Sequence, residues 1–318
     1  MTVTDHRQAP VNEFHHEALV YRDEAGFVAG TTSFIREGLA ADEAILVAVV
    51  APKIRLLRDA LGADADRVLF ADMLELGRNP ARIIPAWRQF VDDHVAPGRP
   101  ARGIGEPIWV GRRPVEVLEA QLHEALLNVA FDGGPGWRLQ CPYDATQLDE
   151  SVLSAARSSH RHVRQADGAR SNGAYPGDRH AVTAFGAPLD EPAGASIALV
   201  FDARALPTLR DAVLRQGALV GVTGQRLDDL ALAAHEMVTN SIRHGGGRGS
   251  VRMWSDRDAF VIEVRDHGRV RDLLAGRTLP DRGAECGRGL WLANQLCDLV
   301  QLRSGEAGTT VRLITWLG

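Results

Sequence analysis

A carboxylate, an amide and an imidazole recur at four-residue intervals in the last third of the chain. Glu236, Asn240 and His244 fall within residues 225–244, where apolar residues at three- and four-residue steps predict a helix. Each of the three side chains lies only about 40° round the helix from the last. Asn240 offers a carbonyl oxygen suited to Mg²⁺, which binds oxygen and bridges phosphates. Glu236 could orient or deprotonate a hydroxyl or water that attacks a γ-phosphate.

A second candidate segment follows an apolar strand predicted at residues 260–264. Asp266 comes at the end of this strand and Gly268 two residues later. The carboxylate could accept a hydrogen bond from an exocyclic amine while the backbone turns beneath a base. Taken alone, such a segment is more often an ordinary turn.

Two glycine-containing segments come later in the chain. The first opens a helix, where glycines allow close approach of the backbone and free N–H groups meet phosphate; it consists of Gly287, Arg288, Gly289 and Leu290. The second, Gly308 to Thr310, opens the last predicted strand. Each segment is weak on its own, and their order and spacing carry the signal.

The elements that would position these residues combine hairpins with helices. Strands are expected at residues 196–201, 250–254, 259–265, 299–303 and 309–316, and helices at 206–220, 225–244 and 287–296. A loop is expected from residue 266 to residue 286. This order predicts an α+β fold in which one face of an antiparallel or mixed sheet is covered.

The first half of the chain has a different pattern, in which short apolar runs alternate with amphipathic stretches. Strands are expected at residues 18–21, 44–50, 68–71, 104–108 and 137–141, and helices at 25–39, 54–61, 80–94 and 115–131. The alternation predicts an α/β domain with a doubly wound parallel sheet. The expected organisation is a flexible tail at 1–13, a first domain at 14–166, a Gly- and Pro-rich linker at 167–194 and a second domain at 195–318.

Composition narrows the classes of partner. The formal net charge is -5, so the chain lacks the basic field that draws proteins to nucleic acid, and no direct nucleic-acid partner is expected. The longest apolar run, residues 44–51, is far shorter than the roughly 20 residues that span a membrane. We therefore expect no membrane association and a cytoplasmic location.

The segments of the last third together resemble the boxes of GHKL ATPases, in the family's order and from about residue 196 to the end. The N box is matched by Glu236-Met-Val-Thr-Asn240-Ser-Ile-Arg-His244-Gly, and the glycine boxes by Asp266-His-Gly268 and Gly287-Arg-Gly289-Leu. The wording is most similar to the anti-sigma serine kinases of the sporulation and stress-response type. One departure is Val270, which stands where the family's Asp-x-Gly-x-Gly pattern has its second glycine.

The resemblance implies a Bergerat-fold domain that binds ATP and Mg²⁺. Asn240 would hold the Mg²⁺, Glu236 would be the general base, and Asp266 would read the adenine amine. Gly287 and Gly289 would shape the lid against the phosphates. The remaining residues of the implied ATP site are His244, Gly268, Arg288, Leu290 and Thr310.

Residues from about 14 to 163 are similar to the MEDS sensory domain. The matching text lies at residues 14–21, 35–40, 105–109, 123–128 and 141–144. The resemblance implies a RecA-like fold, yet the sequence contains no Gly-x-x-x-x-Gly-Lys-Ser/Thr segment, so we expect this domain to sense an unknown small-molecule signal and not to hydrolyse ATP. The domain's histidines match no standard ligand spacing, so no metal is expected at His15, His16, His123, His160 or His162.

Three functions follow from these resemblances. The leading one is an anti-sigma regulator that binds a sigma factor and ATP and phosphorylates a serine or threonine of an anti-anti-sigma (STAS) partner, under control of the first domain. The resemblance also allows a homodimer. One alternative is a sigma-sequestering module with a degenerate nucleotide site, which Val270 favours. The other is a sensor histidine kinase, for which His160 and His162 are the only nearby phospho-acceptors.

Overall fold

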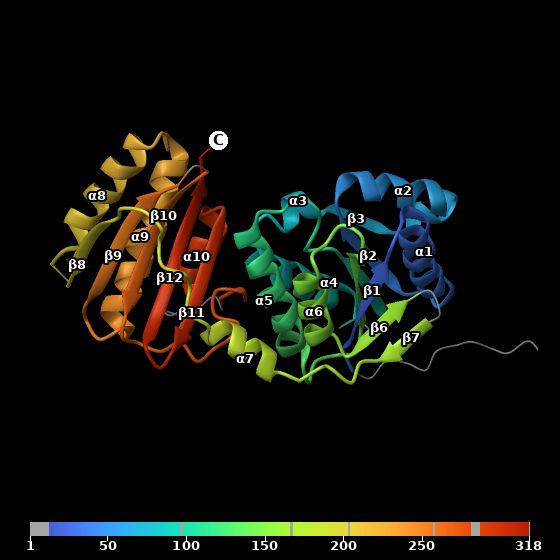
Figure 1. Ribbon diagram of the computed structural model, residues 1–318. Helices are drawn as coiled ribbons and strands as arrows, with labels where there is room; N and C mark the ends of the chain where they lie inside the picture. The colour runs from blue at the N-terminus through green and yellow to red at the C-terminus, as the bar shows by residue number, and fades with distance from the viewer. Residues whose placement is uncertain are drawn as a thin grey trace, which may run out of the picture. The chain divides into compact units, whose positions relative to one another are not determined.

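The computed structural model describes residues 13–95, 98–165, 168–202, 204–256, 258–280 and 287–317. The chain divides into two compact units, shown in Figure 1, each with its own β-sheet. The first unit comprises Met1–Gly77 and Ala86–His180, and the second comprises Arg78–Pro85 and Ala181–Gly318. Apart from Glu13, the predicted tail lies outside the described residues.

The first unit contains a seven-stranded sheet in the order β3-β2-β4-β5-β1-β6-β7. All neighbouring strands pair in parallel except β6 and β7. The sheet is therefore parallel-rich, as the alternating pattern predicted. The strands are β1 His15–Tyr21, β2 Ala44–Val49, β3 Leu69–Asp72, β4 Ala101–Gly105, β5 Arg138–Asp144, β6 His162–Gln165 and β7 Gly168–Ser171.

Helices cover both faces of this sheet. Arg102 of β4 donates to the carbonyl oxygen of Phe34 in α1, whereas the neighbouring Gly103 packs under Trp87 of α4. Because successive strand residues point to opposite faces, α1 and α4 lie on opposite sides. The helices are α1 Glu24–Ala40, α2 Ala51–Leu61, α3 Met73–Leu76, α4 Ile83–His94, α5 Pro114–Phe131 and α6 Glu150–Ser159, with the 3-10 turn η1 Gly62–Arg67. The 3-10 turn η2 Pro80–Arg82 belongs to the second unit.

The second unit contains a five-stranded sheet in the order β11-β12-β10-β9-β8, with antiparallel pairing throughout. Three of its helices, α8, α9 and α10, lie on one side of the sheet (Figure 1). The strands are β8 Ile197–Phe201, β9 Gly249–Ser255, β10 Ala259–Asp266, β11 Leu299–Gly305 and β12 Gly308–Trp316. The helices are α7 Arg179–Gly186, α8 Leu206–Leu219, α9 Gln225–His244 and α10 Arg288–Leu296.

Several elements differ from the expected pattern. Helix α2 begins at Ala51 instead of residue 54, because Pro52 is favourable in the first turn of a helix. Helix α6 was not predicted, and β7 and α7 lie within the stretch expected to be a linker. No helix in the described part of the chain is both long enough and apolar enough to cross a membrane.

Candidate functional site

Helix α9 presents the predicted polar row beside its buried stripe. The stripe faces the sheet and comprises Leu230, Ala231, Ala233, Ala234, Met237, Val238 and Ser241. Glu236 and Asn240 lie next to it and are half-buried, whereas His244 is exposed at the last residue of the helix. The apolar side of the helix thus fixes its rotation, and this rotation sets the position of the carboxylate and the amide.

The first turn of α10 lies directly against Glu236 and Asn240. A Cβ atom at Gly289 would be 2.8 Å from Glu236 Oε2 and 2.9 Å from Asn240 Nδ2, so only glycine fits without movement. Gly287 caps this helix with a left-handed backbone, at a φ of 92°. The unpaired N–H groups of a helix N-terminus are suited to phosphate. The structure therefore brings an amide oxygen, a carboxylate and potential phosphate donors to one place.

Asp266 is held at the C-terminal end of α9. Ser241 Oγ donates to its Oδ2 at 2.6 Å, and the Gly268 N–H donates to its Oδ1 at 2.7 Å. A Cβ atom at Gly245 would be 2.3 Å from the Asp266 Cγ, so the chain turns tightly against this carboxylate. Sequence reasoning assigned Ser241 to the core stripe and missed this contact; a hydroxyl beside Asn240 within an apolar stripe was the available signal.

The two threonines at the start of β12 lie on different faces of the sheet. Thr309 pairs with Asp266 and Thr310 with Arg265, and successive strand residues alternate in direction. Thr309 Oγ1 donates to the Gly268 carbonyl oxygen at 2.9 Å. The structure therefore brings Thr309, which the sequence analysis had not selected, to the Asp266 turn. It does not bring Thr310 there.

Two further predicted residues belong to α10. Arg288 is exposed in its first turn. Leu290 is partly buried, and its Cγ would lie 2.6 Å from a Cβ atom at Gly276, which has a positive φ of 73°. Leu290 therefore packs against the preceding loop, whereas residues 281–286 of that loop lie outside the described residues.

Comparison with known families separates the two halves of the chain. A profile of the MEDS family (MEthanogen/methylotroph, DcmR Sensory domain) matches residues 15–161, and a profile of the histidine kinase-like ATPase domain matches residues 199–315. The chain joins a MEDS domain to a histidine kinase-like ATPase domain. No curated protein matches the sequence.

Among solved structures, the chain is similar to the RsbU and RsbW domains of Rv1364c from Mycobacterium tuberculosis. The sequences are 20% identical, and the match covers 38% of this chain and 32% of that chain with a TM-score of 0.30. The chain thus corresponds to about a third of the length of that protein.

The ATPase domain family implies ATP binding, typically with Mg²⁺. The residues present fit these groups, because Gly289 leaves a space at its Cα that any side chain would fill, next to an amide and a carboxylate. Hard oxygen ligands of this kind suit Mg²⁺, which also takes phosphate oxygens and water.

Val270 replaces a glycine in the ATPase domain without requiring an unusual backbone. Asp42 is the only non-glycine residue with a positive φ in the described part of the chain, so Val270 has an ordinary conformation. Its N–H donates to Ser304 Oγ at 2.9 Å, and Ser304 Oγ lies 2.8 Å from Thr309 Oγ1. The first glycine box is thus anchored to β11 and β12 through two hydroxyl groups.

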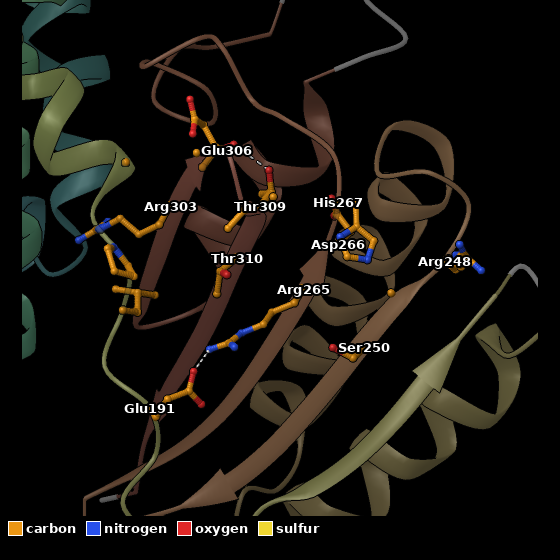
Figure 2. A pocket seen from close by; sticks show the side chains of 18 of the residues that line it. Glu191, Arg248, Ser250, Arg265, Asp266, His267, Arg303, Glu306, Thr309 and Thr310 are labelled. Carbon is orange, nitrogen blue, oxygen red and sulfur yellow. Dashed lines mark hydrogen bonds and ion pairs between the residues drawn. The ribbon is translucent and has the colours of Figure 1, made fainter.

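A cavity of about 650 Å³ in the ATPase domain borders the turn at Asp266 (Figure 2). It lies over the ends of β9 to β12, and its described lining includes Asp266 and Thr309 as well as Arg265 and Thr310, but neither Glu236 nor Asn240. The sheet here carries an ionic network.

In that network, the buried Glu263 carboxylate pairs with three arginines, namely Arg252, Arg265 and Arg312. Glu191 pairs with Arg252 and Arg265 at 2.5 and 2.7 Å, and their hydrogen bonds lower the pKa of its carboxyl to about 2. This network attaches the segment after α7 to the sheet. We assign it no nucleotide.

Proposed function

We propose that this protein is an anti-sigma regulator whose ATPase domain binds ATP with Mg²⁺ and phosphorylates a serine or threonine of an anti-anti-sigma (STAS) partner. The single observation that supports it best is the contact of Gly289 with Glu236 and Asn240, because Asn240 directly precedes Ser241, which bonds Asp266. This arrangement fits a nucleotide with its base at Asp266 and its phosphates at the start of α10.

Each residue then has a distinct role. Asn240 holds Mg²⁺, which when bound neutralises charge on the phosphates. Asp266 accepts a hydrogen bond from the adenine amine, and Gly287 and Gly289 let the backbone approach the phosphates. Gly268 permits the close turn beneath the base, with its N–H fixing Asp266.

Glu236 is the proposed general base. The hydroxyl oxygen of the partner forms a bond to the γ-phosphorus while the bond from that phosphorus to the bridging oxygen of ADP breaks. The hydroxyl proton passes to a Glu236 carboxylate oxygen. The site is bordered by His244 at the end of α9 and by Arg288 and Leu290 at the start of α10. In place of Thr310, Thr309 lies at this site, where it donates to the Gly268 carbonyl oxygen.

The proposed partners follow from the same resemblance. They are a sigma factor, a STAS protein and a second copy of the chain. An unknown small-molecule signal acts on the MEDS domain, and the protein works in the cytoplasm. We also propose that the MEDS domain has a RecA-like fold and does not hydrolyse ATP.

The sequestering module without catalysis is the second candidate function, and Val270 in the first glycine box is the observation that favours it. The histidine kinase alternative is weaker. His160 is fully buried and bonded to the Ala156 carbonyl oxygen, and His162 lies in strand β6 instead of an exposed helix. Neither residue offers an accessible phospho-acceptor on a helix.

The experiment that tests the proposal is titration calorimetry of ATP with and without Mg²⁺, on the wild type and Asn240→Ala. The matched control is Gln225→Ala, an exposed substitution on the same helix. Magnesium-dependent binding in the wild type and control that is lost in Asn240→Ala supports the proposal. Absence of nucleotide binding in all three proteins would leave the sequestering module as the better account.

A further inference from the structure

Four side chains that can each coordinate a metal meet inside the MEDS domain. His16 comes from β1, Glu124 from α5, Cys141 from β5 and His160 from the residue that follows α6. Their ligand atoms all lie within 4.8 Å of one another. Each residue is at most 1% exposed, so the protein encloses the cluster and shields it from solvent.

Hydrogen bonds fix the tautomer of both imidazole rings. His160 Nδ1 lies 2.7 Å from the Ala156 carbonyl oxygen, which can only accept, so Nδ1 carries the hydrogen. His16 Nδ1 lies 3.3 Å from Asn128 Oδ1, whose orientation is set because Asn128 Nδ2 donates to the Ser159 carbonyl oxygen at 2.7 Å. In neutral rings, both Nε2 atoms therefore present lone pairs.

These lone pairs face other electron-rich atoms. His16 Nε2 lies 3.3 Å from Glu124 Oε2 and 3.3 Å from Cys141 Sγ, and His160 Nε2 lies 3.1 Å from Glu124 Oε2. The thiol offers one weak donor for this set. His160 Nε2 and both Glu124 oxygens have no hydrogen-bond partner among the described residues. Buried acceptors in this arrangement need a positive charge between them.

We propose that His16, Glu124, Cys141 and His160 form a binding site for a divalent transition-metal ion, with Zn²⁺ as the best match. A tetrahedral Zn²⁺ ion with N, O and S ligands separates neighbouring ligand atoms by about 3.3–3.8 Å, close to the distances above. Two imidazoles, one thiolate and one carboxylate form a borderline-soft set that suits Zn²⁺ better than Mg²⁺ or Ca²⁺. Nδ1–H groups bonded to protein oxygens are also the usual orientation of zinc-bound histidines.

The site has the features of a structural centre. All four ligands come from the protein, which leaves no open position for substrate. The Sγ–H bond of Cys141 breaks on binding, its proton passes to solvent or buffer, and the Sγ–metal bond forms. The ion would link β1 and β5 of the sheet to α5 and α6, so the metal would stabilise the packing of these helices on the sheet.

The histidine spacing predicted no metal here, because the ligands come from four elements far apart in the sequence. The first strand was also expected to begin at residue 18, which left His16 outside it, and α6 was not expected at all. In the structure, His16 lies in β1, and His160 is placed by the end of α6.

The test uses the full chain, measured for metal content as purified and then titrated with Co²⁺ after treatment with a chelator. We expect one ion per chain, a thiolate-to-cobalt charge-transfer band, tetrahedral d–d bands and displacement of Co²⁺ by Zn²⁺. Cys141→Ser should lose the charge-transfer band, whereas Cys297→Ser, which alters a buried cysteine outside the cluster, should keep it. Asn128→Ala, which frees His16, should bind Co²⁺ about 10–100-fold more weakly.

X-ray absorption at the zinc edge of the wild type provides a readout that does not depend on a variant's folding. One sulfur and three nitrogen or oxygen neighbours are expected. The proposal is overturned if the wild type takes up no Co²⁺ or Zn²⁺, if the spectrum of Cys141→Ser equals that of the wild type, or if absorption shows no sulfur ligand.

Discussion

The backbone of Gly289 lies against the Glu236 carboxylate so closely that a Cβ atom at position 289 would be 2.8 Å from Oε2. The two residues come from different helices, α10 and α9. Their contact joins the second glycine box to the N box, and in the proposed function it brings the phosphates of the nucleotide to Asn240.

Gly289→Ala is expected to weaken magnesium-dependent ATP binding about tenfold or more. The added methyl must displace Glu236 or the first turn of α10, and overpacking of this kind typically costs about 1–3 kcal/mol. Titration calorimetry measures the loss. Gly305→Ala is the control, because its Cβ atom would meet the nearest atom, the Gly186 carbonyl oxygen, at an ordinary 3.6 Å. Equal affinities for both variants would contradict the proposed site.

Glu236→Gln should separate ATP binding from phosphoryl transfer. The amide keeps the size of the side chain beside Gly289, so ATP affinity should change little. Removal of a general base typically lowers the rate by about 10²–10⁴-fold. Transfer of labelled γ-phosphate to candidate STAS proteins is the measurement. Wild-type transfer rates in this variant would exclude Glu236 as the base.

Asp266→Asn should reduce ATP affinity roughly 10–100-fold, because the amide replaces a charged acceptor whose hydrogen bonds are worth about 1.5–3 kcal/mol. The fold should persist, since the amide oxygen can still accept from the Gly268 N–H and the amide nitrogen can donate to Ser241 Oγ. Calorimetry with ATP and GTP gives the affinities. The exposed Asp256→Asn serves as the control, and an unchanged preference for ATP in Asp266→Asn would place the base elsewhere.

In the MEDS domain, Glu106 should make stability depend on pH. Burial raises the pKa of its carboxyl from 4.5 to about 7, although Lys53 donates to it. Between these values the folded protein retains a proton that the unfolded chain has released. The free energy of unfolding should therefore fall as pH rises through this window, by at most about 1.4 kcal/mol per pH unit.

Glu106→Gln is expected to flatten that fall, as measured by urea unfolding at a series of pH values. The exposed Glu75→Gln should keep the wild-type slope. A slope that is identical in wild type and Glu106→Gln would show that Glu106 titrates alike in the folded and unfolded chains.

The sequence by itself determined the features that depend on neighbours along the chain. The period of apolar residues predicted a helix over residues 225–244, and α9 spans Gln225–His244. The same period placed Glu236 and Asn240 on one flank of it. Continuous apolar runs between amphipathic stretches predicted the parallel-rich sheet, because a strand covered on both faces has no polar alternation.

Only the tertiary structure decided which distant residues meet. The pairing of β10 with β12 puts Thr309, and not Thr310, on the same face of the sheet as Asp266. A shift of one residue in this register would move every side chain to the other face. Likewise, His16 in β1 meets Glu124 in α5 and His160 after α6, although the three residues are far apart in the sequence. Periodicity describes which side of an element is buried, whereas such meetings depend on strand register and helix packing, which no local pattern specifies.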